Sequence, residues 1–130
     1  EWAGVIYLNK DHDGEPGTSF YYHRNRKTGI MPMGTDLIFD AIEAKTSPHE
    51  YTEVFREDRL DESKWTTLLT VPIRYNRLII YNARQFHRNA SAFGSSKKDA
   101  RLVQGLFFSD SKTVKKNFAG ISTNSPVSKS

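Results

Sequence analysis

Six short segments of the chain have the residue pattern of β-strands. Each has a centre of β-branched and aromatic side chains, and turn-forming residues separate it from the next segment. The segments lie at residues 2–9, 18–24, 65–71, 75–82, 84–90 and 101–108. All connections between them are short except one, which favours an antiparallel jelly roll or small barrel. We therefore expect a mainly β protein.

The one long connection, residues 30–64, predicts helices inserted between the second and third strands. Apolar residues recur at helical spacing in residues 35–45, with Thr35 as the expected N-cap and Lys45 in the last turn. Residues 49–64 are charged and predict a second, shorter helix or a long surface loop. The apolar face of the first helix is expected to consist of Leu37, Ile38, Ala41 and Ile42.

A length of 130 residues indicates a single domain, which we place at residues 1–109, followed by a flexible basic tail at residues 110–130. The net charge of +4 is unevenly distributed. Residues 1–96 contain 12 basic and 13 acidic side chains, whereas residues 97–130 contain 7 and 2. The only aromatic residue of the tail is Phe118, so the basic segment lacks the stacking side chains typical of nucleic-acid binding. We expect no nucleic-acid partner.

The chain contains no cysteine, which excludes a disulfide framework, a thiolate zinc site and a cysteine nucleophile. No apolar run approaches the roughly 20 residues that span a bilayer, and no signal-peptide pattern is present. A cytoplasmic location without membrane contact is therefore expected. The sequence enters a predicted core strand directly after Glu1, so we expect it to be part of a longer gene product.

Two residues near the C-terminal strands suggest chemistry. His87 follows Phe86 in a short predicted strand, and Arg101 opens the last strand. A neutral imidazole is a good ligand for Fe(II), and a guanidinium binds a carboxylate through two parallel hydrogen bonds. On neighbouring strands, the pair could hold a metal and an acidic cosubstrate side by side. Taken singly, each is an ordinary surface residue at a strand end.

Four motifs follow one another in the order Gly17–Tyr21, Asn76–Tyr81, Phe86-His87 and Arg101–Gln104. Their order and spacing resemble the prolyl-4-hydroxylase-like branch of the Fe(II)/2-oxoglutarate-dependent oxygenases, in particular its small uncharacterised bacterial and viral members. The resemblance covers residues 2–108 without the insertion. It implies the C-terminal part of a double-stranded β-helix, or jelly roll, that is incomplete at its N-terminus and carries one or two inserted helices.

By this resemblance, His87 is one ligand of an Fe(II) centre, and Arg101 pairs with the distal carboxylate of 2-oxoglutarate. A phenol from Tyr21 or Tyr22 could bind the same carboxylate. Because neighbouring side chains of a strand alternate, only one of the two faces inward, and Tyr21 is preferred. The alternative for both is an aromatic core or sheet-surface role. The implied activity is hydroxylation of a C–H bond in an unknown substrate, with Fe(II) and 2-oxoglutarate as cofactors.

The His-x-Asp ligand pair of these oxygenases has no counterpart in the chain. Its place lies before Glu1, and the turn Asp11-His12-Asp13 does not replace it, because adjacent residues do not project to one side as a spaced pair on a strand does. No spacing recruits His23 or His49. We therefore expect this chain alone to be inactive.

Two other interpretations are open at this point. One is a non-catalytic binding or assembly domain on the same barrel, with the basic tail contacting a partner. In that case the sheet edge at residue 2 would favour pairing with a missing segment or with another chain. The other is a cupin-type metal enzyme of a different kind, which would need more histidines than the four in this chain.

Overall fold

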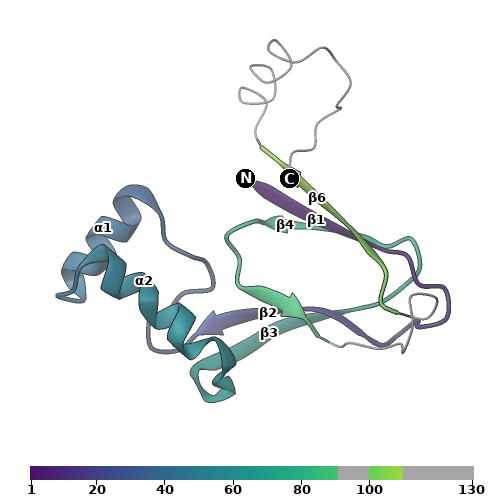
Figure 1. The fold of residues 1–130 in the computed structure, drawn as a ribbon, viewed down its shortest axis with the longest axis horizontal. Helices are drawn as coiled ribbons and strands as arrows, with labels where there is room; N and C mark the ends of the chain where they lie inside the picture. Colours follow the sequence, from purple (N-terminus) through teal and green to yellow (C-terminus); the bar gives the residue numbers. More distant parts are fainter. Residues whose placement is uncertain (91–99, 110–130) are drawn as a thin grey trace, which may run out of the picture. The chain divides into compact units, whose positions relative to one another are not determined.

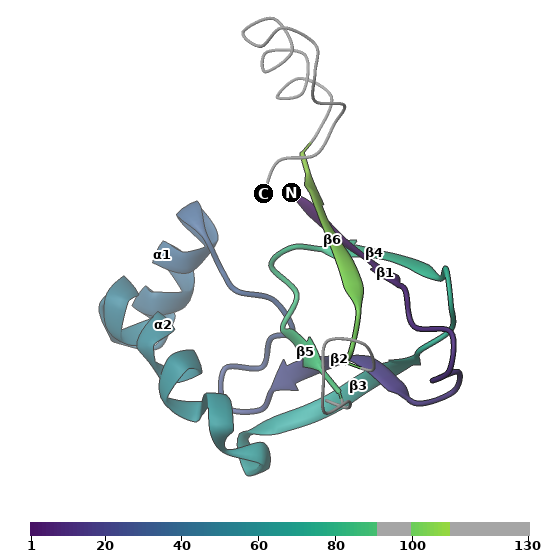
Figure 2. The same cartoon turned by 45° about the vertical axis from the view of Figure 1, so that its right-hand side comes forward.

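The computed structural model describes residues 1–90 and 100–109, which are mainly β, with two three-stranded antiparallel sheets and two α-helices (Figure 1, Figure 2). The strands are β1 Trp2–Tyr7, β2 Pro16–His23, β3 Trp65–Pro72, β4 Leu78–Asn82, β5 His87–Asn89 and β6 Val103–Phe108. The helices are α1 Gly34–Glu43 and α2 Pro48–Glu57, and two 3-10 turns follow, η1 Asp58–Leu60 and η2 Glu62–Lys64. No helix within these ranges is long and apolar enough to cross a membrane.

The secondary structure predicted from the residue pattern is confirmed in its main elements. A strand lies in each of the six predicted segments, and α1 lies in the predicted first helix. Residues 49–64, for which the sequence allows a helix or a loop, form most of α2 and the two 3-10 turns. The tail predicted at residues 110–130 lies outside the described residues.

Helix α1 differs in detail from the prediction. It begins at Gly34 after an extended Met33, so Thr35 lies inside the first turn and is not the N-cap; no side-chain cap forms. The helix ends at Glu43, so Lys45 lies beyond it, in a left-handed conformation with φ 56°. The predicted apolar face is only partly covered. Ala41 is buried and Leu37 packs against the core, whereas Ile38 and Ile42 are 50% and 66% exposed.

The chain divides into two compact units. The first unit comprises residues 1–17, 71–83 and 89–130, and the second unit comprises residues 18–70 and 84–88. The predicted insertion at residues 30–64 thus lies entirely in the second unit.

The first unit contains the sheet β4-β1-β6, in which β1 is the central strand. Both neighbours run antiparallel to β1, with Gly4 opposite Ile80 on one side and opposite Leu106 on the other. Tyr7, at the end of β1, is only 1% exposed. Its N–H donates to the Arg77 carbonyl at 3.0 Å and its carbonyl accepts from the Asn76 N–H at 2.8 Å. The backbone pairing of the central strand therefore extends beyond β4.

Asn9 joins the end of the β1 segment to the start of the β6 segment. Its side chain is buried, its Nδ2 donates to the Ala100 carbonyl at 3.0 Å, and its Oδ1 accepts from the Leu102 N–H at 2.7 Å. A side-chain amide carries both a donor and an acceptor, and here both are used. From the sequence, Asn9 is only a turn residue; its partners lie more than 90 positions away.

The second unit contains the two helices and most of the sheet β3-β2-β5. Its buried core is Ala41, Tyr51 and Phe55, so the facing sides of α1 and α2 supply it. Helix α2 begins with a capping box: Ser47 accepts from the Glu50 N–H, and the Glu50 carboxylate accepts from the Ser47 N–H. Partly buried residues that pack against this core are Met31, Leu37, Ala44, Trp65 and Phe86.

We expect Gly17→Ala to destabilise the protein, because a Cβ at position 17 would lie 2.5 Å from the Val71 carbonyl oxygen and 2.6 Å from the Tyr7 hydroxyl. The expected loss is roughly 1–3 kcal/mol of unfolding free energy, as for other overpacked sites. Urea denaturation followed by circular dichroism measures it.

The matched control is Gly105→Ala on β6, where the nearest atom to a new Cβ is 4.0 Å away, on Phe107. This change should be neutral or stabilising by up to about 1 kcal/mol, because alanine loses less conformational entropy than glycine. Equal urea midpoints for the two variants would contradict the crowding at Gly17.

Candidate functional site

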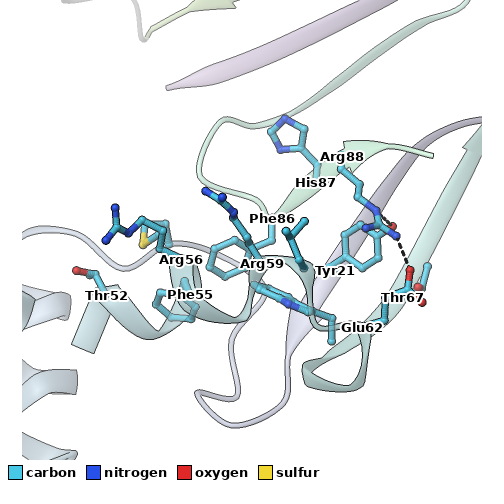
Figure 3. Close-up of a pocket in the computed structure, with 13 residues that line it drawn as sticks. Tyr21, Thr52, Phe55, Arg56, Arg59, Glu62, Thr67, Phe86, His87 and Arg88 are labelled. Atoms are coloured by element: carbon cyan, nitrogen blue, oxygen red, sulfur yellow. Dashed lines mark hydrogen bonds and ion pairs between the residues drawn. The ribbon is translucent and has the colours of Figure 1, made fainter. Parts of the chain in front are cut away.

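A cavity of about 610 Å³ opens within the second unit. Figure 3 shows that its lining combines aromatic rings with several basic side chains. The rings belong to Phe55 on α2, Trp65 at the start of β3, and Phe86 just before β5. The basic side chains are Arg56, Arg59, His87 and Arg88. Cavities of this size, apolar with a few polar groups, are typical small-molecule sites.

The aromatic wall is fixed by ring-on-ring packing. Phe86 lies with its ring centroid 4.9 Å from that of Phe55 and 5.1 Å from that of Trp65. A fourth ring, the buried imidazole of His23, lies edge-on to Phe55 and Trp65 at 5.0 and 4.7 Å. Rings at such distances and tilts attract one another beyond their simple burial, so this wall is held in place.

His23 is completely buried at the end of β2, and both of its ring nitrogens have partners. Its Nδ1 accepts from the Arg26 N–H at 3.1 Å, so Nδ1 carries no proton. The proton is therefore on Nε2, which donates to Oδ2 of Asp58 at 2.7 Å. His23 thus acts as a neutral connector between β2 and η1. No sequence pattern distinguishes His23, because Asp58 lies 35 positions away with no motif between them.

Asp58, the first residue of η1, is held twice. Besides the bond to His23, its backbone carbonyl accepts from Nε1 of Trp65 at 2.8 Å. These two bonds fix the start of the turn that carries Arg59 and Leu60 into the cavity lining.

Arg88 and Tyr21 both line the cavity, and the dashed lines in Figure 3 mark the hydrogen bonds of Arg88. The Arg88 Nε donates to the Tyr21 hydroxyl at 2.8 Å, and its Nη2 donates to Oε1 of Glu62 at 3.2 Å. These two hydrogen bonds raise the pKa of Arg88, and the bond to Tyr21 has the larger effect. The Tyr21 phenol, predicted to bind a cosubstrate carboxylate, thus has Arg88 as its partner within the second unit.

His87 begins β5 and is exposed to solvent. Its Nδ1 lies 2.7 Å from the Gln85 carbonyl, which can only accept, so the neutral ring carries its proton on Nδ1. Nε2 is then the nitrogen with the lone pair. Metal-binding histidines are typically oriented in this way, by a carbonyl on the other ring nitrogen. The geometry is compatible with the predicted role of His87 as a ligand.

Arg101 lies in the first unit, two residues before β6. Its Nη2 donates to the Gly17 carbonyl at 2.9 Å, and its guanidinium lies 5.6 Å from the centre of the Tyr7 ring. Both contacts orient the side chain. The structure therefore places His87 and Tyr21 in one unit and Arg101 in the other. His87 and Tyr21 lie in strands, as the sequence predicts, whereas Arg101 precedes β6 and does not open it.

The described residues do not by themselves form a metal centre. Nowhere in residues 1–90 and 100–109 do three His, Asp or Glu side chains come together in a group that could hold a metal ion. In the turn Asp11-His12-Asp13, His12 pairs with Glu15 at 3.3 Å, and Oδ1 of Asp13 accepts from the Tyr75 N–H at 3.1 Å. A facial iron site needs three protein ligands, and the sequence predicts His87 as one of them.

Comparison with known proteins identifies a family. Residues 1–108 match the model of DUF6445, a family of unknown function, and the chain belongs to this family. No curated protein and no solved structure matches the chain.

We expect Asp58→Ala to destabilise the second unit, because it leaves the buried Nε2–H of His23 without an acceptor. The expected cost is about 1–3 kcal/mol of unfolding free energy, the usual penalty for an unsatisfied buried donor. Asp58→Asn should retain most of the stability, because the amide oxygen still accepts from Nε2. Urea midpoints measure both; equal losses for Ala and Asn would contradict the role of the side chain as an acceptor.

Proposed function

We propose that this member of the DUF6445 family forms the C-terminal part of a jelly-roll domain of the Fe(II)/2-oxoglutarate-dependent dioxygenase type. In that domain Arg101 would hold the distal carboxylate of 2-oxoglutarate, and His87 would supply one metal ligand. The reaction is the hydroxylation of a C–H bond in an organic substrate. The observation that carries the proposal is the order of the strands in the two sheets.

A jelly roll has eight strands in two sheets of four, and the chain passes repeatedly from one sheet to the other. Here β1, β4 and β6 form one sheet, and β2, β3 and β5 form the other. A simple meander would place consecutive strands side by side, whereas β1 lies between β4 and β6, and β2 lies between β3 and β5. The last six strands of a jelly roll are distributed between its two sheets in the same way, and they follow the same order within each sheet. This agreement supports a jelly roll over other mainly β folds.

The position of Arg101 supports the assignment of a carboxylate partner. It precedes the last strand, and the Gly17 carbonyl and the Tyr7 ring hold its guanidinium in one orientation. A guanidinium held in this way presents a planar set of N–H donors, which matches the two oxygens of a carboxylate. 2-Oxoglutarate carries one carboxylate at each end, and its distal carboxylate is the proposed partner of Arg101.

The described residues fit an iron ion less well than they fit a carboxylate. A facial iron site needs three protein ligands, and no group of three such side chains occurs among these residues. We therefore assign no step of the reaction to an iron ion bound by these residues alone. The same observation supports the second candidate function, a non-catalytic binding domain on the same fold. Such a domain could retain the carboxylate site at Arg101 without oxidative activity.

We expect Arg101→Ala to weaken 2-oxoglutarate binding at least about tenfold, because it removes a charge-assisted contact of roughly 1.5–3 kcal/mol. Isothermal calorimetry on the 130-residue chain measures the affinity. The matched control is Arg74→Ala, which removes the same charge from an exposed position of the first unit. Unchanged affinity in Arg101→Ala would remove the basis of the proposal.

This chain alone should form no succinate from 2-oxoglutarate when Fe(II), ascorbate and dioxygen are supplied. One imidazole does not retain Fe(II) in a facial site. The control is His87→Ala, which should give the same background. Robust succinate formation that is lost when Asp11, His12 or Asp13 is replaced would show that this turn completes a metal site after all.

A further inference from the structure

The cavity of the second unit contains chemistry that the proposed dioxygenase function does not use. We propose that it binds a small-molecule anion with an apolar or aromatic body, with Arg59 as the main contact of the anionic group. The aromatic wall of Phe55, Trp65 and Phe86 would receive the apolar body. His87, the proposed iron ligand, also lines the cavity, but the groups that carry this inference are Arg59 and the aromatic wall, all in the second unit, whereas the proposed 2-oxoglutarate anchor Arg101 lies in the first.

The arginines of the cavity differ in how far their charge is already neutralised. Arg56 forms an ion pair with Glu53, one turn earlier on α2. Arg88 bonds to the Tyr21 hydroxyl and to Glu62. The Arg59 guanidinium, in contrast, has no hydrogen bond or ion pair anywhere in the part of the chain that the structure describes.

Within the lining, Arg56 is paired with Glu53 and Arg88 with Glu62, so the excess positive charge is that of the Arg59 guanidinium. An arginine side chain remains charged at all physiological pH values. Concave apolar walls exclude water and strengthen the attraction of such a charge for an anion. Figure 3 shows Arg56, Arg59 and Arg88 around the same cavity as the aromatic rings, so one ligand can reach both kinds of group.

The backbone that carries Arg59 is held in place, although the side chain itself is exposed. It follows Asp58, whose carboxylate accepts from buried His23 and whose carbonyl accepts from the Trp65 indole. The backbone of η1 is thus tied to the same rings that form the cavity wall. A binding group attached to a fixed turn loses less conformational entropy when a ligand binds than one on a free loop.

The size of the cavity favours a small molecule over an acidic protein segment. A volume of about 610 Å³ lies within the range of roughly 300–1,000 Å³ typical of small-molecule sites. The wall offers rings for stacking, and its charge comes from a few guanidinium groups. An aryl or acyl compound with one phosphate or carboxylate group has the matching chemistry.

The test uses 1-naphthyl phosphate as the probe, titrated into the full chain and followed by calorimetry. We expect saturable binding, and weaker binding both of 1-naphthol, which lacks the anion, and of inorganic phosphate, which lacks the ring. Arg59→Ala should weaken the aryl phosphate at least about tenfold, the usual effect of losing a charged hydrogen-bond partner. Arg59→Lys should retain part of the affinity, and Arg74→Ala should retain all of it.

A measurement without any variant gives a second readout. The chain has two tryptophans, Trp65 in the cavity wall and Trp2 on β1 in the first unit. Saturating 1-naphthyl phosphate should shift the indole N–H resonance of Trp65 and leave that of Trp2 unchanged. The inference is overturned if no saturable binding occurs, if both indoles respond equally, or if Arg59→Ala binds as the unmodified chain does. Tighter binding of hexaglutamate than of 1-naphthyl phosphate would also overturn it, in favour of an acidic peptide.

The same variants separate this inference from the proposed function. Arg101→Ala should leave the affinity for 1-naphthyl phosphate unchanged, and Arg59→Ala should leave the affinity for 2-oxoglutarate unchanged. Loss of both ligands in Arg59→Ala alone would place 2-oxoglutarate in the cavity and would refute the assignment of Arg101. Loss of both in Arg101→Ala alone would refute the assignment of Arg59.

Discussion

A buried imidazole must satisfy two ring nitrogens, and in the second unit this requirement decides where the helical insertion ends. His23 takes an N–H on Nδ1 from its own turn and gives its Nε2 proton to Asp58, which fixes the first residue after α2. Trp65 then bonds to the carbonyl of the same aspartate. Asp58 therefore connects the sheet to the 3-10 turn that follows helix α2. The aromatic wall of the cavity depends on these contacts, because the His23 ring packs against Phe55 and Trp65.

Each unit has an arginine whose surroundings suit an anion, but the two achieve this differently. Arg101 is oriented by a backbone carbonyl and by the face of a tyrosine ring, which leaves a polar, directional contact. Arg59 projects from a fixed turn beside apolar rings, which suits a ligand with an apolar body. The first arrangement is the one that we propose for 2-oxoglutarate, which is short and doubly charged. The second matches a larger and less polar molecule.

The sequence predicted the elements of the fold well, because strand and helix patterns are local. The alternation and β-branched centres located all six strands, and the helical spacing located α1. The first residue of α1 was less predictable. Thr35 is a good capping residue by type, yet the helix begins one residue before it, at Gly34. The spacing also could not predict which residues of the apolar face are buried. Ile38 and Ile42 belong to the same predicted face as Ala41, yet they are exposed and Ala41 is buried.

Long-range contacts were beyond the reach of the sequence. His87 could be placed in a short strand, and Arg101 near the start of β6, because the strands themselves could be predicted; their roles as ligand and carboxylate anchor are still predictions. The bond between His23 and Asp58 could not be found, because an isolated histidine and an aspartate in a charged stretch have no distinguishing pattern. The cavity could not be predicted from the sequence either, because its rings and arginines come from four separate segments.

The pairing of β1 with β6 has a consequence for the order in which the protein folds. Trp2 lies opposite Phe108, so the sheet of the first unit forms only after the two ends of a very long loop have met. Closing such a loop costs conformational entropy before any contact compensates for it, so we expect this pairing to form late. Helix α2 has the opposite character, because its capping box is complete within four residues. The insertion can therefore acquire structure while the strands that flank it are still unpaired.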